Sequence, residues 1–379
     1  MPPVLAQDRL VRKEVALGTI RELEPPQSHI GLRLLAPFRE VGSDDVIFDY
    51  AKGLTDGLAP ARAEDAESEL AQKDITSVGI GRAAILDWAL KDHYTASDVT
   101  RYRENLLIAA QQGALGVPPM SVGSMLQDFN TKVARDDALR RRKLDNRIEW
   151  MITQAVETGG IAYNDGKIKF AVSYGRPGAQ TNQAPTGPLW DAGTTHDPIG
   201  DILAVQEYMY DLYGVRMTRA ITSKKVLNTI LNSDRFIART GMVGATGSAP
   251  IDPRYIVDGW GPNAAIQIVE RATNLTFIPY DSVYRTRPIG SNTVTNNRFL
   301  SENKIFFLPN EDDIADLEDD MLGFGKTLTS PHPEGNWTAG YYEWERETVD
   351  PWGTDRGTGI KAFPVFPHMD LTYTMTVLS

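Results

Sequence analysis

The sequence predicts an α+β fold. A single helical pattern runs from Ser121 to Thr158, a period-two pattern typical of a strand covers 167–174, and residues 197–309 alternate between helical and strand-like segments. Strand-like segments dominate again over 310–379. This separation of helical, mixed and β-rich regions favours an α+β protein over a repeated βαβ architecture.

Residues 1–43 are predicted to form an extended arm, because prolines and glycines interrupt any long element there. Apolar residues nevertheless recur along it: Val15, Leu17, Ile20, Leu23, Ile30, Leu32, Leu34 and Leu35. An apolar segment with little regular structure must bury these side chains against something. A neighbouring chain is the expected partner.

Residues 44–74 are predicted to form a projecting loop. The segment holds nine acidic and three basic residues. The strand-like run DDVIFDY opens it, DITSVGI follows as a return strand, and the residues between them are polar. Two strands joined by a long polar excursion suggest a two-stranded projection rather than a compact domain.

The stretch SVGIGRAAILDWAL contains G-x-G-x-x-A at Gly79, Gly81 and Ala84, with an apolar, potentially helical run after it. A dinucleotide fingerprint needs an apolar strand before the first glycine and an acidic residue at the end of the next strand. Here the preceding run, QKDITS, is polar, and the region about 20 residues on is helix-like. The glycines are better explained by a bent strand that closely approaches another backbone.

The helix from Ser121 to Thr158 is followed by Gly159 and Gly160, and at ~1.5 Å per residue it would be about 55 Å long. Its apolar stripe consists of Leu126, Phe129, Val133, Leu144, Ile148, Met151 and Ala155. Asp137 and Arg140 interrupt that stripe, and residues 135–149 hold six basic and four acidic side chains. Lateral salt bridges, within one chain or between chains, explain this charged middle better than a nucleic-acid patch does.

A hairpin is expected next, with a turn at Asn164-Asp165-Gly166. Asp197 as N-cap, Pro198 in the first turn and Gly214 after the last turn predict a helix, and Thr222 or Ser223 is expected to cap another. Further strands are expected at VRMTRAI, AAIQIVE, LTFIPY, KIFFLP, YYEWERETV and LTYTMTVL.

Composition excludes several functions. The net charge of −11 disfavours a nucleic-acid-binding protein, and the absence of cysteine excludes disulfides, thiolate metal sites and cysteine nucleophiles. The first residues hold no apolar signal-peptide core, and no apolar run approaches the ~18 residues of a membrane span. Synthesis inside the cell is expected.

The motifs that could indicate ligand binding or catalysis do not match the residue patterns that these functions require. Gly325-Lys326-Thr327 resembles the end of a P-loop, but Asp320 stands where its first glycine belongs. Seven acids within 311–320 do not match a calcium loop and are better explained as a solvated helical face. The five histidines are scattered and no nucleophile motif occurs. No catalytic, cofactor-binding or metal-binding residues are predicted.

Four phrases resemble the lambda major head protein family, also called the capsid E family, which has the Hong Kong 97 fold of tailed-phage major capsid proteins. They are LRLLAPFREVGSDDVIFDY, RRRKLDNRIEWMITQAVETGGIAY, GKIKFAVSYG and the tail phrase YYEWERETVDPWGTDRGTGIKAFPVFPHMDLTYTMTV. The order of parts is similar too, and the resemblance covers essentially the whole chain.

The resemblance implies the following division: an N-terminal arm at 1–43, an extended E-loop at 44–88, the first part of a peripheral domain at 89–196 with its spine helix at 121–158, an axial domain at 197–309 and the peripheral return at 310–379. It implies a head protein that self-assembles into hexamers and pentamers. These form an icosahedral virion shell around double-stranded DNA, assembled in the bacterial host cytoplasm. The implied partners are further copies, a separate scaffold protein, a portal and a decoration protein, with no membrane.

Contacts between subunits are expected at two charged segments: Arg62, Glu64, Asp65, Glu67 and Glu69 of the loop, and Arg140, Arg141 and Arg142 of the helix. Two other functions stay open at this point. One is an α/β enzyme with its catalytic domain at 197–309, and the other is a minor phage structural protein.

Overall fold

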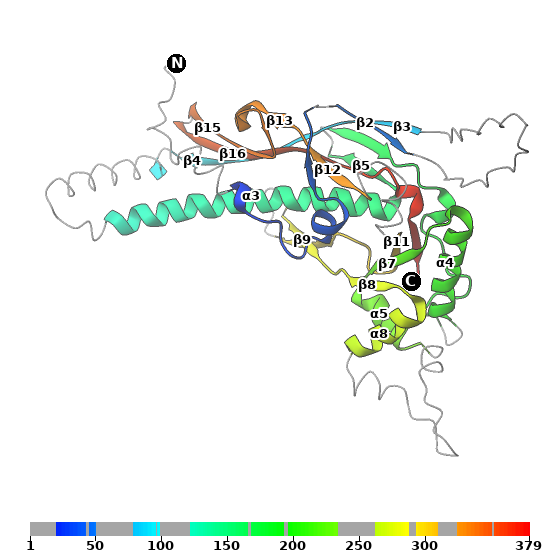
Figure 1. The fold of residues 1–379 in the computed structure, drawn as a ribbon. Helices are drawn as coiled ribbons and strands as arrows, with labels where there is room; N and C mark the ends of the chain where they lie inside the picture. The colour runs from blue at the N-terminus through cyan, green and yellow to red at the C-terminus, as the bar shows by residue number, and fades with distance from the viewer. Residues whose placement is uncertain are drawn as a thin grey trace, which may run out of the picture. The chain divides into compact units, whose positions relative to one another are not determined.

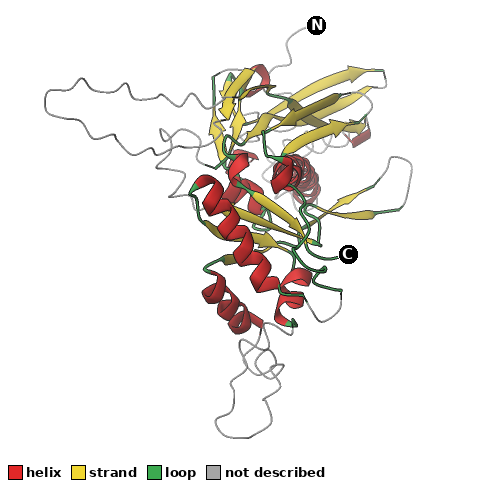
Figure 2. Cartoon of the chain, turned by 90° about the vertical axis from the view of Figure 1, so that its right-hand side faces the viewer, coloured by secondary structure: helices red, strands yellow, loops and turns green. Residues whose placement is uncertain are grey.

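The computed structural model describes residues 20–42, 45–50, 79–95, 97–98, 122–165, 168–192, 196–233, 262–287, 293–309, 324–350 and 352–379. They divide into two compact units. The first comprises the described residues within 1–46, 83–149 and 327–364, and the second those within 47–82, 150–326 and 365–379. Both units mix helices and strands (Figures 1 and 2). The finer domain boundaries expected from the sequence stay predictions.

The predicted long helix is confirmed as α3, Val122–Thr158, which has 37 residues (Figure 1). Gly159 follows it with a left-handed φ of 75°. The last turn of α3 is capped from outside the helix, because Arg176 donates hydrogen bonds to the carbonyl oxygens of Val156 and Glu157, each at 2.7 Å. A guanidinium therefore satisfies two acceptors that have no partner within the helix.

Burial along α3 follows the predicted stripe. The described members of that stripe are each at most 3% exposed: Val133, Leu144, Ile148, Met151 and Ala155. The side chains of Leu126 and Phe129 lie outside the described part. The two charged residues that interrupt the stripe, Asp137 and Arg140, are buried as well, so the apolar period correctly identified the inward face even where its residues are charged.

The first unit contains a five-stranded sheet in the order β1-β12-β16-β15, with β4 also paired to β16. Its strands are β1 (Phe38–Glu40), β4 (Asp87–Thr95), β12 (Lys326–Thr329), β15 (Tyr341–Val349) and β16 (Trp352–Val365). Strands β15 and β4 flank β16 in antiparallel register, while β1 and β12 are parallel. Because Lys326 and Thr327 lie in a strand, Gly325-Lys326-Thr327 does not form a P-loop.

Glycines on β16 make room for aromatic rings from β15. Gly357 pairs with Trp344, and Gly359 pairs with Tyr342. A Cβ atom at either glycine would overlap the ring opposite it. The two rings can lie across the β16 backbone only because these positions carry no side chain.

The G-x-G-x-x-A motif lies entirely within β3 (Gly79–Ala84), which pairs with β2 (Asp45–Tyr50) in a two-stranded sheet. The interpretation as a strand is confirmed. The helical run suggested after the motif is wrong, because residues 87–95 form β4. All nine residues of β4 pair with β16, and this pairing with a distant strand overrides the local apolar pattern.

Residues 20–42 correct the prediction of an arm that is buried only by a neighbour. They contain a π-helix at Gly31–Leu35 as well as β1. Ile20, Leu32 and Leu35 are at most 3% exposed within this one chain, whereas Leu23 and Leu34 are more than one-third exposed. Three of the six described apolar residues of this segment therefore pack into the same subunit. Residues 1–19 lie outside the described part.

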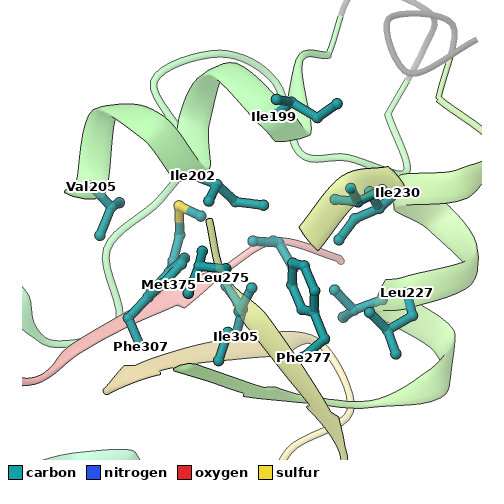
Figure 3. Close-up of a cluster of buried hydrophobic side chains, with 14 of the residues drawn as sticks. Ile199, Ile202, Val205, Leu227, Ile230, Leu275, Phe277, Ile305, Phe307 and Met375 are labelled. Atoms are coloured by element: carbon teal, nitrogen blue, oxygen red, sulfur yellow. The ribbon is translucent and has the colours of Figure 1, made fainter. Parts of the chain in front are cut away.

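The second unit is built on a four-stranded sheet, in the order β17-β11-β7-β8. The elements are α4 (Pro198–Tyr213), β7 (Met217–Thr222), α5 (Lys224–Leu231), α8 (Pro262–Thr273), β8 (Thr276–Pro279), β11 (Lys304–Pro309) and β17 (Tyr373–Thr376). Their side chains meet in one apolar core, and Figure 3 shows residues from the helices facing those of the strands. Examples are Ile199, Ile202, Leu227, Ile230, Phe277, Ile305, Phe307 and Met375.

The helix caps predicted in this unit are confirmed. The Asp197 carboxylate accepts the Gly200 N–H at 3.1 Å, and Gly214 ends α4 with a φ of 70°. Of the two candidates for the next cap, Ser223 is the one used, since its hydroxyl accepts the Val226 N–H at 3.2 Å.

The strand expected at AAIQIVE is wrong, because these residues lie in helix α8. Ile266 and Ile268 alternate as in a strand, but Val269 and Thr273 are the buried positions, at a spacing of four. This spacing places them on one helical face.

The remaining elements are short. The predicted hairpin is confirmed by the antiparallel pair β5 (Gly160–Asn164) and β6 (Lys169–Ser173). The others are β9 (Val283–Thr286) paired with β10 (Thr295–Arg298), β13 (Pro331–His332) paired with β14 (Thr338–Ala339), and 3₁₀ turns at Gly178–Gln180, Pro333–Gly335 and Met369–Leu371.

Candidate functional site

The charged middle of α3 is the part of the first unit where the sequence predicted contacts between chains. The structure divides the three successive arginines between two faces of the helix. Arg140 and Arg141 are 1% and 4% exposed, whereas Arg142 is exposed. Successive residues on a helix are about 100° apart, so neighbours in sequence point in different directions.

Arg140 pairs with carboxylates from two elements. Its guanidinium contacts Asp137, one turn earlier in α3, and Asp92 of β4. Its Nε also donates a hydrogen bond to the Thr358 hydroxyl of β16 at 3.1 Å. The side chain thus links the helix to two strands of the sheet.

Arg356 of β16 binds the carboxylate of Asp137 as well. It donates two hydrogen bonds to Asp137, from Nη2 at 2.8 Å and from Nε at 3.1 Å. It also lies within ion-pair distance of Glu343 and Glu345 on β15. We call the six residues Asp92, Asp137, Arg140, Glu343, Glu345 and Arg356 the buried charge cluster.

The buried charge cluster contains two cations and four carboxylates, and Glu343 is a carboxylate of the cluster whose pKa is raised. Glu343 is 4% exposed and accepts no hydrogen bond from any described residue, although Arg356 is close. Burial, reinforced by the negative charges of Asp137 and Glu345 and opposed by Arg356, raises the pKa of Glu343 to about 7. Near neutral pH this site therefore holds a proton part of the time.

Arg141 anchors residues at the beginning of the described chain. Its guanidinium lies 3.4 Å from the centre of the Tyr341 ring, and its Nε donates to Asp145 at 3.1 Å. It also donates to the carbonyl oxygen of Ile20. Burial raises the pKa of Tyr341 well above its ordinary value, and Asp145 adds to this effect. The phenol therefore stays a hydrogen-bond donor to that carboxylate.

Glu149 makes a second anchor for the same segment. Its carboxylate is completely buried and accepts the backbone N–H groups of Gly31 at 2.9 Å and Leu32 at 2.8 Å. These N–H groups belong to the π-helix, so a side chain of α3 fixes the path of residues 29–36.

The outward face of α3 is different. The exposed cations between residues 131 and 146 are Lys132, Arg135, Arg142 and Lys143, and we call these four residues the basic face. None of them forms an ion pair or hydrogen bond with a residue in the described part of the chain. Leu139 lies among them with 46% of its surface exposed.

The structure describes only some of the predicted site residues. Arg62, Glu64, Asp65, Glu67 and Glu69 lie outside the described residues. Arg140 and Arg141 are buried and form ion pairs within one chain, and the contact with another chain that was expected for Arg140, Arg141 and Arg142 stays a prediction. Sequence reasoning missed Arg356 and Glu149, whose partners Asp137 and Gly31 lie more than 100 residues away in the sequence, and Glu343, which lies close to Arg356.

Within the described ranges, no three His, Asp or Glu side chains are arranged to hold a metal ion. No helix in that part of the chain is long and apolar enough to cross a membrane. The geometry of the described residues shows charged groups that join secondary-structure elements to one another.

Comparison with protein families gives one decisive match. The family described as phage major capsid protein E matches residues 16–315. The chain belongs to this family. This is a family of structural capsid proteins, so the major capsid function predicted from the sequence is confirmed and the enzyme alternative is not supported. Comparison with curated protein sequences gives no significant match.

Solved structures are similar to this chain over most of its length. A protein assigned as a capsid protein of a prophage of Escherichia coli CFT073 is 13% identical, with a TM-score of 0.52 over 96% of this chain and 97% of that one. A phage-related protein from Bordetella bronchiseptica RB50 is 14% identical, with a TM-score of 0.48 over 96% and 95%. The first likeness confirms the predicted α+β fold of the Hong Kong 97 type.

Proposed function

We propose that copies of this capsid protein assemble into hexamers and pentamers, which form the icosahedral shell of a tailed phage around double-stranded DNA. Membership of the major capsid protein E family carries the proposal. The net charge of −11 supports it, because a strongly basic inner wall would bind the packaged phosphates tightly. A separate scaffold protein, a portal and a decoration protein are the proposed partners, with assembly in the host cytoplasm.

The proposal assigns 1–43 to the arm, 44–88 to the E-loop, 89–196 and 310–379 to the peripheral domain, and 197–309 to the axial domain around the capsomer axis. Exposed apolar side chains on α4 support the last assignment. Leu203, Tyr208, Tyr210 and Leu212 are each 38–51% exposed, and such surface is stabilised when another subunit covers it.

Electron microscopy of the expressed full chain, with and without its scaffold protein, tests the proposal. Hexamers, pentamers or closed shells are the expected result. A compact monomer under all assembly conditions would contradict it, as would a small closed oligomer with a defined ligand stoichiometry.

Deletion of residues 55–72 tests the role of the acidic loop. We expect shells to be lost while the proposed axial domain at 197–309 stays folded. A finer variant neutralises Glu64, Asp65, Glu67 and Glu69 by amide substitution, and its control neutralises four acids within 311–320. Equal numbers of shells from both variants would contradict a specific role for the loop.

A further inference from the structure

The basic face of α3 is unusual because the rest of the chain offers so much negative charge. Four cations lie on it without an ion-pair or hydrogen-bond partner among the described residues, although the chain as a whole carries a net charge of −11. By contrast, the two buried arginines of this helix form ion pairs with carboxylates: Arg140 with Asp137, and Arg141 with Asp145. Arg356 of the sheet also pairs with Asp137.

The spacing of these cations makes them one surface. Lys132, Arg135, Leu139, Arg142 and Lys143 follow one another at steps of three or four residues, with one adjacent pair at the end. Such steps keep side chains on one side of an α-helix. Asp136, the carboxylate next to Arg135 in sequence, is partly buried and accepts a hydrogen bond from Tyr94 at 3.1 Å, so it turns toward the sheet.

We propose that the basic face of α3, together with Leu139, binds an acidic surface of a second copy of this chain. This inference rests on the proposed function and adds to it the surface that makes the contact. Charge complementarity favours a second copy as the partner. Each subunit has a net charge of −11, and the part of it outside the basic face is more negative still, because the four cations are not counted there.

Leu139 favours a protein partner over packaged DNA. A side chain that is 46% exposed in the middle of the basic face gains from contact with apolar atoms of another protein. Against a duplex it would face phosphates and their water instead. Protein interfaces commonly place an apolar centre inside a charged rim.

The sign of the charge excludes one arrangement of the contact. Two basic faces brought together across a two-fold axis would repel each other. The basic face must therefore meet a different, acidic surface of the next copy. A head-to-tail contact of this kind closes into a ring when the rotation allows it, and hexamers and pentamers are such rings.

The test compares two double variants with the same change in net charge. R142E/K143E reverses two cations of the basic face, whereas K169E/R271E reverses two exposed cations elsewhere that have no partner among the described residues. Circular dichroism and urea unfolding establish that each full-length variant folds. Sedimentation velocity and electron microscopy then measure assembly at several salt concentrations.

We expect R142E/K143E to need about tenfold more protein, or more, for half-maximal assembly, with a smaller salt dependence than the wild type. The control should assemble normally. L139S should weaken assembly while leaving its salt dependence unchanged, because this substitution changes no charge. If the double variant R142E/K143E does not fold, L139S still tests whether this surface makes the contact.

Three results would overturn the inference: equal loss of assembly in the control, normal assembly of R142E/K143E and L139S, or normal assembly accompanied by lost binding to a DNA duplex. The last would assign the basic face to phosphates. If the wild type itself never assembles, the proposed function fails, so the two failures are distinguishable.

Discussion

Glu149 offers the sharpest test of how the segment at residues 29–36 is held. Its buried carboxylate accepts two backbone N–H groups, those of Gly31 and Leu32. Hydrogen bonds to a charged group contribute about 1.5–3 kcal/mol each, and a buried donor left without a partner costs about 1–3 kcal/mol. Glu149→Ala should therefore destabilise this contact by about 3–5 kcal/mol, and Glu149→Gln by less, because one acceptor oxygen remains.

Hydrogen exchange measures this effect locally. We expect the segment at residues 29–36 to open independently of the rest of the protein. A loss of about 3 kcal/mol or more from the free energy of this local opening then makes amide exchange at Gly31 and Leu32 faster by about 100-fold or more. Glu157→Ala is the matched control on the same helix. Its carboxylate accepts from Ser301 and Lys304, so its loss should affect exchange near 301–304 and leave residues 29–36 protected.

The reasoning would be refuted by Glu149→Ala protein that folds and keeps wild-type exchange rates at Gly31 and Leu32. A uniform rise in exchange across both units would also count against it. That pattern means that the substitution lowers global stability and does not release a particular segment.

Three further predictions concern single side chains. Since burial raises the pKa of Glu343 to about 7 from 4.5, the folded chain binds this proton more tightly than the unfolded chain. The free energy of unfolding should thus fall by roughly 2–3 kcal/mol as pH rises through that window, and Glu343→Gln should flatten the decrease in urea titrations. Gly357→Ala places a methyl group against Trp344 and should cost about 1–3 kcal/mol, with altered Trp fluorescence. Arg176→Ala removes the donors to the last carbonyls of α3 and should cost about 1–3 kcal/mol in the same titrations.

The sequence predicted best those features that depend on neighbouring residues. The glycine after α3, the Asp197 cap and the end of the strand at Asn164 are set by local backbone chemistry, and all three identify real element ends. The inward face of α3 was also readable, because helical periodicity does not depend on the partner that the face packs against.

Prediction from the sequence failed where contacts with residues far away in the sequence determine the structure. Strand β4 has a local pattern compatible with a helix, and only its pairing with β16, more than 250 residues away, makes it a strand. Ile20 and Leu32 gave no sign that their own chain would bury them. The partners of Arg140 were equally hidden, since Asp92 lies 48 residues earlier and Thr358 lies 218 residues later.

The division of charge on α3 follows from the same long-range contacts. Arg142 and Asp145 are three residues apart, a spacing that allows an ion pair on a helix. The structure instead turns Asp145 inward, where it binds Arg141 and the Tyr341 hydroxyl. Asp137 is likewise held inside by Arg356. Contacts with Arg141, Tyr341 and Arg356 thus turn Asp145 and Asp137 inward, and neither of these acids neutralises the outward cations of the basic face.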